Sequence, residues 1–522
     1  KRIGGTSGFR RTQVEKHCSR VMTWQTHDSG HAPSPPSTGR DESEETQVKL
    51  VWLGYSFEQV KLKAILFLLF LLFFCLFAAC AFEFVNGFHD TANAVATVIY
   101  THSLKPTQAV VWSGFMNFLG LLTGGVGVTM SIIGLLPTEL LIDSNVYHSM
   151  AMALALLLSA ILWNLGTWYF GIPASSSHTL IGSIIGIGLG HALLPENSNK
   201  DISSVNWDKV IEIGQALFLS PLFGFSLAII LMYILKKTIT NKDIFKEPKK
   251  NSPPPLWIRS ILIFTCTLVS FFHGRNDGQK GIGLVMVILI AFLPGYFAIN
   301  TSLDLNMVQN SLNTVQTVSV KIDTLPLSEK ELASYHQLLA SSADLKTILA
   351  NKPDIQNLST TQKFDIRKAA LTINKNAKKL IESESVSLSD EDKSAFKKAT
   401  QGEKAPFFAF GASSATGMAG VTDFAPAWVM WMIALSLGLG TMIGWKRIVI
   451  TIGEKIGKDH LTYAQGASAE LIASITIGLA TAYKWPVSTT HVLSSGIAGT
   501  MVASRGIKNL QGGTVKNIVM AW

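Results

Sequence analysis

The stretch PASSSHT, residues Pro173 to Thr179, places three consecutive serines between two runs of apolar residues. A near copy, PVSTTH, occupies residues Pro486 to His491. Proline suits the first turn of a helix, and the residues after it present free backbone N–H groups beside short hydroxyls. Because such a helix start attracts anions, the two copies predict a site for a tetrahedral oxyanion that both of them line.

The composition around these motifs is that of a polytopic membrane protein. The chain has 522 residues, of which 48% are hydrophobic and 15% are charged. Charge-free runs such as Gln108 to Ile133 and Ser149 to Phe170 exceed the roughly 20 residues that cross a bilayer as a helix. The formal net charge of +9 comes largely from short loops beside apolar runs, a pattern typical of membrane topology and not of nucleic-acid binding.

The cysteines show no pattern typical of a metal or redox site. Cys75, Cys80 and Cys266 lie in apolar runs, Cys18 lies in the polar start of the chain, and none of them forms a CxxC pair. We therefore expect packing residues and neither a resident metal nor another cofactor.

Apolar runs divide the chain into two membrane repeats. They lie near residues 64–100, 108–133, 149–170, 179–194, 211–235, 260–299, 424–444, 461–481 and 488–503. We expect a disordered tail at 1–60, a first repeat at 61–235, a basic cytoplasmic loop at 236–259, the start of a second repeat at 260–299, a soluble helical insert at 300–406 and the remainder of the second repeat at 407–522. The apolar stretch that reaches Trp522 is short, so we expect the last helix to be incomplete.

The two repeats carry the same parts in the same order. A polar patch, NGFHDTANA at Asn86 to Ala94, interrupts the first long run, and HGRNDGQKG at His273 to Gly281 interrupts the sixth. Two spans and a hydroxyl-rich helix start follow each patch. The positive-inside rule gives the repeats opposite orientations, so the sequence predicts an all-α inverted-repeat transporter in which the two long helices are broken or re-entrant at these patches.

The polar residues in these motifs are the candidate site. Hydroxyls and amides can replace the hydration shell of an oxyanion, and carboxylates at membrane depth are by default functional. A proton or bound cation would remove their repulsion of an anion and so couple the two ligands. For the anion we select Ser175, Ser176, Ser177, Thr179, Ser488, Thr489, Thr490, Asn93 and Asn276, and for the cation Asp90, Asp277, Asn93 and Asn276.

A second rank of candidates flanks these residues. The carboxyl groups could take part in coupling or solvate helix ends, the histidines could relay protons or bond to neighbouring backbone, and the cations could pair with Asp277. These residues are Glu83, Glu470, His89, His178, His273, His491, Arg275 and Lys280.

Several of the motifs together resemble the bacterial low-affinity inorganic phosphate transporters of the PiT family. The matching stretches are NGFHDTANAVATVIYT, WNLGTWYFGIPASSSHTLIGSIIGIGL, NDGQKGIGLVMVIL and PVSTTHVLSS. The resemblance implies import of inorganic phosphate by cation symport, with protons or sodium as the coupling cation, a metal-phosphate complex as one form of the substrate, a homodimer and a location in the inner membrane. Arg275 and His89 depart from the pattern of that family.

Three alternatives remain open. Hydroxyls and helix ends distinguish phosphate from sulfate weakly, so a transporter of another tetrahedral oxyanion is one. A membrane enzyme that uses the neighbouring Ser177 and His178 is another, although adjacent helix positions do not face each other and no GxSxG elbow is present. A receptor role of the insert is the third.

Overall fold

The computed structural model describes residues 57–135, 146–193, 207–249, 252–350, 352–402 and 416–522. The chain divides into two compact units, residues 1–68 and 69–522. In the first unit the described residues, 57–68, are the opening turns of one helix. Residues 1–56 of the predicted disordered tail, with Cys18, lie outside the described residues, whereas its last four residues, 57–60, are helical and not disordered. Apart from these opening turns, the second unit contains the elements discussed below.

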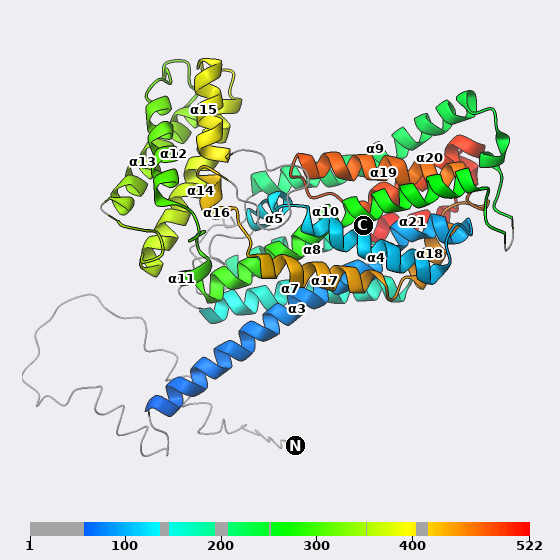
Figure 1. Ribbon diagram of the computed structural model, residues 1–522, viewed down its shortest axis with the longest axis horizontal. Helices are drawn as coiled ribbons and strands as arrows, with labels where there is room; N and C mark the ends of the chain where they lie inside the picture. Colours follow the sequence, from blue (N-terminus) through cyan, green and yellow to red (C-terminus); the bar gives the residue numbers. More distant parts are fainter. Residues whose placement is uncertain (1–56, 136–145, 194–206, 250–251, 351, 403–415) are drawn as a thin grey trace, which may run out of the picture. The chain divides into compact units, whose positions relative to one another are not determined.

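Every regular element in the described ranges is a helix (Figure 1). The first repeat contains α3 (Phe57–Tyr100), α4 (Pro106–Leu122), α5 (Gly127–Ile133), α7 (Val146–Tyr169), α8 (Ser176–Ala192) and α9 (Trp207–Thr238), and η3 (Lys242–Phe245) follows it. The second contains α10 (Leu256–Phe292), α11 (Pro294–Phe297), α17 (Ala427–Thr441), α18 (Lys446–Ile450), η4 (Thr451–Lys455), α19 (Tyr463–Ala482), α20 (Thr489–Arg505), η5 (Ile507–Asn509) and α21 (Gly512–Ala521). Between α11 and α17 lie α12 (Leu305–Ser319), α13 (Glu329–Leu349), α14 (Thr360–Glu382), α15 (Asp390–Gln401) and α16 (Ala419–Thr422).

The two repeats have matching elements. Each begins with a long helix, α3 or α10, and continues with a bent helix pair, a straight helix and a helix of 17 residues, α8 or α20. The bent pairs are α4 with α5, at 77°, and α17 with the segment Lys446–Lys455, at 55°. The predicted all-helical, repeated fold with broken helices is therefore confirmed.

The predicted positions of the breaks were wrong. Both α3 and α10 run as continuous helices through their polar patches. The glycines in the patches serve close packing instead: a Cβ on Gly87 would collide with the backbone of α17, and one on Gly274 with the backbone of Asn117 on α4. The helices stay intact because these glycines admit a neighbouring backbone while the polar side chains find partners on other helices.

The bend between α4 and α5 is held from α10 by the buried side chain of Gln279. Its Oε1 accepts hydrogen bonds from the backbone N–H groups of Val128 (2.8 Å) and Thr129 (3.4 Å) at the start of α5. Its Nε2 donates to the carbonyl of Gly124, at 3.0 Å, inside the bend. Backbone groups that a broken helix frees must find such partners where no water reaches them.

Length and apolar composition mark which helices can cross a bilayer. Among the described residues, four helices pass, and up to six spans result if each bent pair counts as one. The four are Lys61–Tyr100, Met150–Tyr169, Val210–Thr238 and Leu256–Phe292. With 17 residues each, α8 and α20 lie at the lower limit for a full crossing.

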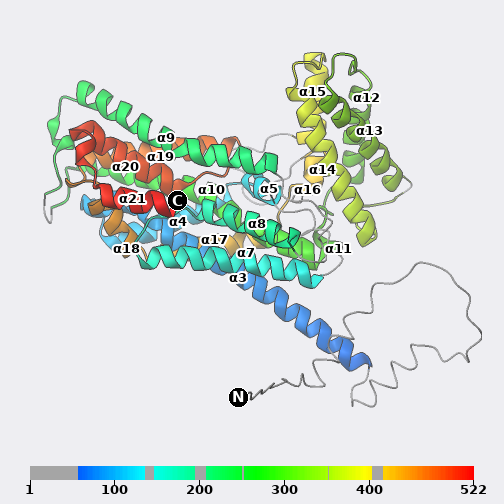
Figure 2. The ribbon, with the colours of Figure 1, turned by 180° about the vertical axis from the view of Figure 1, so that it is seen from behind.

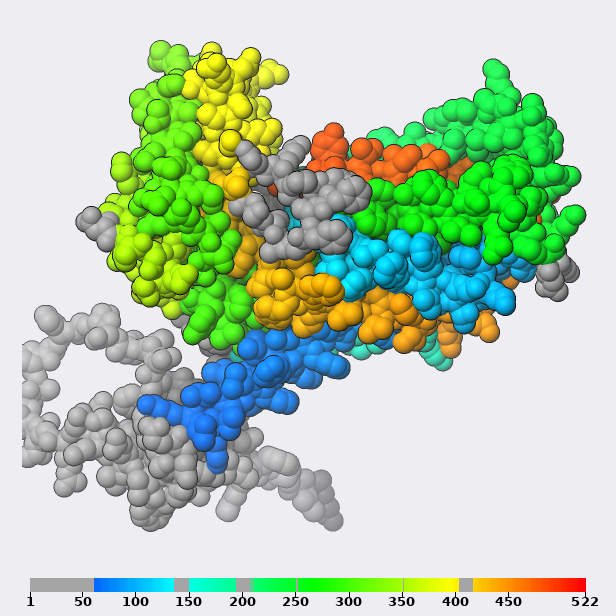
Figure 3. Space-filling view, in the orientation of Figure 1, coloured from blue at the N-terminus to red at the C-terminus, as the bar shows by residue number. Residues whose placement is uncertain are grey.

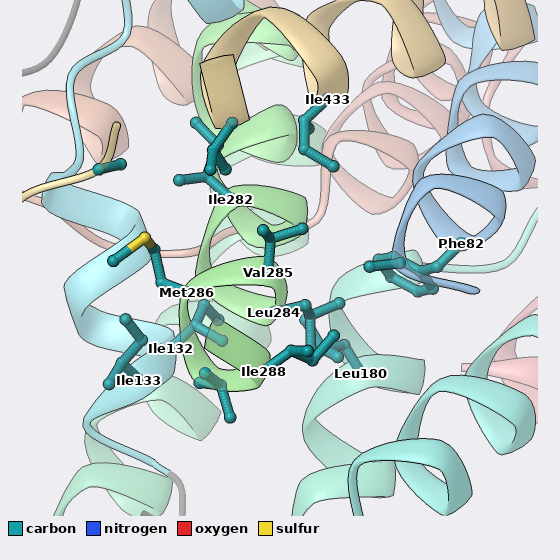
Figure 4. Close-up of a cluster of buried hydrophobic side chains, with 14 of the residues drawn as sticks. Phe82, Ile132, Ile133, Leu180, Ile282, Leu284, Val285, Met286, Ile288 and Ile433 are labelled. Atoms are coloured by element: carbon teal, nitrogen blue, oxygen red, sulfur yellow. The ribbon is translucent and has the colours of Figure 1, made fainter. Parts of the chain in front are cut away.

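Apolar side chains from both repeats form a shared core. Phe82 of α3, Leu180 of α8, Ile433 of α17 and several residues of α10 converge in it (Figure 4). On the face shown in Figure 3, α4 and α17 lie side by side, and α9 packs along α20 as Figures 1 and 2 both show. Cys75 and Cys266 are buried and Cys80 is half-buried; none of these three forms a disulfide.

The helices between α11 and α17 have a hydrophobic core of their own. Val308, Leu312 and Val315 recur at helical spacing along α12, and all three are buried. Ser328 and Ser359 begin α13 and α14 with capping boxes, in which side chain and backbone satisfy each other's free groups. These residues therefore fold as a compact helical group around one apolar centre.

Two buried cations of α14 join this group to the end of the membrane part. Arg367 donates from Nη1 to the carbonyl of Ala298 at 2.9 Å, and Lys363 donates from Nζ to the carbonyl of Gly295 at 2.8 Å. Burial lowers the pKa of Arg367 to about 10, so its guanidinium remains charged at neutral pH. Charged donors make strong hydrogen bonds, so α14 is tied to the segment that directly follows α10.

Candidate functional site

The two hydroxyl-rich helix starts lie next to each other. Ser175 is the N-cap of α8 and accepts from the N–H of His178 at 3.2 Å, and Ser488 caps α20 in the same way at 3.1 Å from the N–H of His491. The imidazole rings of the two histidines are 4.4 Å apart between centroids. Ser177 donates to the carbonyl of Val487 at 2.7 Å. The start of α8 thus contacts the start of α20 directly, as the paired motifs predict.

Asp90 of α3 is bound to the start of α20. Thr490 donates from Oγ1 to Asp90 Oδ1 at 2.6 Å, and Asn93 donates from Nδ2 both to Asp90 Oδ1 (3.3 Å) and to Thr490 Oγ1 (3.0 Å). All three side chains are almost completely buried. This contact joins the polar patch of the first repeat to the helix start of the second.

Asp277 of α10 makes the reciprocal contact through Lys280. The Nζ of Lys280 lies 2.7 Å from Asp277 Oδ2 and donates to Ser177 Oγ at 2.6 Å, so the second repeat's patch reaches the first repeat's helix start. Thr489 donates to Asp277 Oδ2 at 3.4 Å. Lys280 is 0% exposed, and a buried ammonium persists only with a counter-charge and good hydrogen bonds.

His273 stands between the two carboxylates. Its Nε2 lies 3.4 Å from Asp90 Oδ2 and 3.6 Å from Asp277 Oδ2, and its Nδ1 is 2.8 Å from the side-chain oxygen of Asn117. One ligand atom from each of Asp90, His273 and Asp277 lies within 4.8 Å of the others, close enough to share a metal ion. In a transporter such an ion would be cargo or coupling ion, and the sequence predicts no resident metal.

Several buried polar atoms around this cluster have no hydrogen-bond partner in the described part of the chain. Unmet donors and acceptors are costly in a buried place, so each of these atoms is a candidate partner for a polar guest. They include Ser176 Oγ, Asp90 Oδ2, Asp277 Oδ1, Asn93 Oδ1 and Asn276 Oδ1.

Other selected residues face their own helix or a different neighbour. Thr179 donates to the carbonyl of Ser175 at 2.9 Å, within α8. Asn276 donates to Thr481 Oγ1 at 2.9 Å and to the carbonyl of Trp485 at 3.2 Å, so its amide nitrogen supports the segment before α20. In the second rank, His89 lies 3.3 Å from Thr167 Oγ1 and 3.4 Å from Asp90 Oδ1.

The remaining second-rank residues lie around the cluster. His178 contacts Ser175 through Nδ1 at 2.9 Å. Glu470 accepts from Thr265 Oγ1 at 2.6 Å, and Glu83 accepts from Asn86 at 2.9 Å; among the described residues Lys280 pairs with neither of them. Arg275 is buried, and its carbonyl accepts from the side chain of Gln279, whereas Lys280 is the cation that pairs with Asp277.

Sequence reasoning missed three supporting residues. Asn117 orients His273, Thr481 holds Asn276, and Gln279 holds the bend of α4 with α5. Asn117 is a lone amide within a long apolar run, and such a residue usually has a specific partner in the protein interior. That signal alone could have identified it.

A model of known protein families matches residues 86–522 under the description "Phosphate transporter family". The chain belongs to the phosphate transporter family. The low-affinity inorganic phosphate transporter PitB of Escherichia coli strain K12 is 41% identical over 489 residues, covering 88% of this chain and 93% of PitB. PitA of the same strain is 40% identical over 490 residues, with the same two shares.

A third similar protein comes from another organism. The low-affinity inorganic phosphate transporter of Buchnera aphidicola from Acyrthosiphon pisum is 38% identical over 475 residues, covering 87% of this chain and 93% of that protein. A solved structure titled "The sodium-dependent phosphate transporter" aligns with a TM-score of 0.45 and 19% identity, over 87% of this chain and 94% of that one. This last similarity is too low to support an argument.

Membership of the phosphate transporter family confirms the resemblance seen in the motifs. It makes the protein a multi-pass membrane transporter and not an enzyme. The Ser177–His178 hydrolase alternative is thereby excluded. The geometry agrees, because Ser177 donates to the carbonyl of Val487, whereas His178 Nδ1 contacts Ser175.

Proposed function

We propose that this protein imports inorganic phosphate across the inner membrane by cation symport, with protons as the coupling cation. The observation that carries the proposal is that both carboxylates meet the start of α20, through Thr490–Asp90 and Thr489–Asp277. Lys280, which pairs with Asp277, also donates to Ser177 at the start of α8. Relatives that cover most of the chain are low-affinity inorganic phosphate transporters, which supports the choice of substrate.

The cluster offers phosphate a suitable set of partners. The first turns of α8 and α20 contribute N–H groups and the positive ends of helix dipoles, and the ammonium of Lys280 adds a full positive charge. Ser176, whose hydroxyl has no partner in the described part of the chain, is a ready donor. Among the described residues, Asp90 Oδ2 and Asp277 Oδ1 accept no hydrogen bond, so either can accept one from a phosphate hydroxyl.

Charge balance supplies the coupling. With His273 neutral, two carboxylates and one ammonium leave the cluster with one net negative charge, which repels phosphate. A proton on His273 or on a carboxylate removes that repulsion, and phosphate in turn favours the proton. A divalent metal held by Asp90, His273 and Asp277 would act in the same way, which makes a metal-phosphate complex a second form of the substrate.

One observation favours phosphate over sulfate. Phosphate at neutral pH still carries a hydroxyl that needs an acceptor, and in the described part of this site one oxygen of each carboxylate accepts no hydrogen bond. Sulfate has no such proton and would face those oxygens directly. Excess sulfate is therefore expected to compete weakly for uptake of labelled phosphate.

Uptake by the full chain in proteoliposomes tests the proposal. An inward proton gradient should drive accumulation of labelled phosphate, and a sodium gradient of equal size should not. Magnesium is added in a parallel arm to detect the metal complex. We also propose that the protein is a homodimer, and the molecular mass of the same purified protein in detergent solution tests this. Accumulation driven by sodium alone would overturn proton coupling. Strong competition by sulfate would overturn the preference for phosphate.

Substitution of the two carboxylates ties the activity to this site. Asp90→Asn and Asp277→Asn keep the side-chain size and remove the charge, so gradient-driven accumulation should be lost in each. Asp243→Asn is the control, because Asp243 is an exposed carboxylate on η3. Full accumulation by both site variants would show that the coupling groups lie elsewhere.

A further inference from the structure

Glu83 is a buried carboxyl group that the phosphate cluster does not use. It lies on α3 seven residues before Asp90, which is about two helical turns, so both side chains lie on the same side of the helix. Its side chain is 0% exposed. The neighbouring Phe82 is part of the apolar core drawn in Figure 4. A carboxylate in such surroundings is costly unless charge or hydrogen bonds compensate it.

The contacts of Glu83 satisfy only one of its oxygens. Oε1 accepts from Asn86 Nδ2 at 2.9 Å, whereas Oε2 has no hydrogen-bond partner in the described part of the chain. Oε2 instead faces Gly281 of α10, where a Cβ would lie 2.5 Å from it and 2.9 Å from Ile433 of α17. The absence of a side chain at Gly281 is what allows the carboxyl group to approach α10 so closely.

The charged groups that act on Glu83 all belong to α10. They are Lys280, Asp277 and His273, and Lys280 already pairs with Asp277 and Ser177. From α17 the apolar Ile433 lies against the same Gly281. Within the described residues, Glu83 thus has charged neighbours in the phosphate cluster but no direct ion pair of its own.

We propose that Glu83 binds the proton that accompanies phosphate, holding it on Oε2 when the site is closed. This inference rests on the proposed proton symport and names the group that holds the transported proton. When α3 and α10 separate and water reaches Gly281, water solvates the ionised form of Glu83. The O–H bond of the acid then breaks, and its proton passes to water. When they close, burial restores the proton. Lys280 and Asp277 act electrostatically on Glu83 and also belong to the phosphate cluster. Their charges therefore link protonation of Glu83 to phosphate binding.

A purely structural role would need only the hydrogen bond from Asn86, and an isosteric amide also offers an oxygen for that bond. Glu83→Gln therefore preserves shape and packing while it removes the proton site. Glu83→Asp keeps a titratable group and serves as the conservative variant. Asp243→Asn, which changes an exposed carboxylate outside the apolar helices, is the matched charge control.

Two transport modes in proteoliposomes separate the roles. Exchange of labelled for unlabelled phosphate at equal pH needs no net proton movement, whereas accumulation driven by a pH gradient does. For Glu83→Gln we expect exchange near the level of the unchanged protein and loss of gradient-driven accumulation, with partial recovery in Glu83→Asp. Equal loss of both modes in an inserted protein, or retention of both, would overturn the assignment.

The protonation state has a readout independent of transport. Infrared spectra of the full chain in lipid should contain a carbonyl band of a protonated carboxylic acid that disappears in Glu83→Gln and persists in Asp243→Asn. If the unchanged protein moves phosphate without protons, the proposed symport fails, whereas this band still decides whether Glu83 holds a proton. A spectrum that is the same in Glu83→Gln would overturn the inference.

Discussion

Lys280 donates a 2.6 Å hydrogen bond from Nζ to the hydroxyl of Ser177, joining α10 of the second repeat to α8 of the first. The same ammonium lies 2.7 Å from Asp277 Oδ2. Ser177 in turn donates a hydrogen bond to the carbonyl of Val487 at 2.7 Å, just before α20. One chain of contacts therefore connects a carboxylate, a cation and both helix starts.

Removal of the Lys280 charge should destabilise the protein and stop transport. Lys280→Gln leaves Asp277 buried without its counter-ion, and breaking a buried pair costs about 3–5 kcal/mol. The double variant Lys280→Gln with Asp277→Asn should recover part of that stability, although not transport. Thermal unfolding of the four proteins in detergent forms a double-mutant cycle; strictly additive effects would contradict a direct pair.

Ser176 and Ser175 should respond differently to alanine. Ser176 Oγ has no partner within the described residues, so Ser176→Ala should leave thermal stability nearly unchanged and raise the half-saturating phosphate concentration. A hydrogen bond to a charged ligand is worth about 1.5–3 kcal/mol, or roughly 10- to 150-fold. Uptake against phosphate concentration measures it, and an unchanged curve would remove Ser176 from the site.

Ser175→Ala, unlike Ser176→Ala, should reduce thermal stability. Ser175 accepts from the N–H of His178 and caps α8, and loss of a serine N-cap typically costs about 1 kcal/mol. Ser488 caps α20 through the equivalent bond, so Ser488→Ala is a parallel test in the other repeat. A melting temperature unaffected by either change would show that these caps do not stabilise the fold.

Gln279→Ala should loosen the bend of α4 with α5. The substitution leaves the N–H of Val128 and the carbonyl of Gly124 without the bonds that Gln279 makes, and each unpaired buried group costs about 1–3 kcal/mol. We expect a lower melting temperature and faster amide hydrogen exchange at residues 124–129. Gln279→Glu keeps the acceptor for Val128 and should protect the start of α5 better than alanine.

Arg367→Met should release α14 from the end of α10 and α11. Its bond to the carbonyl of Ala298 is buried, so the change should accelerate amide exchange at residues 294–300. Lys363→Met removes the neighbouring bond to Gly295 and should add to the effect. Lys368→Met is the control, since Lys368 is exposed on the same helix. Equal amide exchange at residues 294–300 in the Arg367 and Lys368 variants would show that the bond from Arg367 to Ala298 does not hold α14 to this segment.

The repeated motifs, read as sequence, predicted most residues of the candidate site. Asp90, Asp277 and the residues at both helix starts stand out because charge and hydroxyls are costly in long apolar runs. Their duplication indicated that the two sets face one another, and the contacts Thr490–Asp90 and Lys280–Ser177, which each join the two repeats, agree with that expectation. The locations of the breaks could not be predicted in this way, because glycine in an apolar helix indicates either a break or close packing.

The sequence by itself determined that this chain is a helical membrane protein with two related halves, because apolar run length and motif duplication are properties of the chain alone. Only the tertiary structure decided which polar groups pair. The Lys280–Ser177 bond joins residues 103 positions apart, and Gln279 caps a helix that begins about 150 positions earlier. Such contacts depend on how helices pack around glycines such as Gly87 and Gly274, and local sequence periodicity carries no information about partners at that separation.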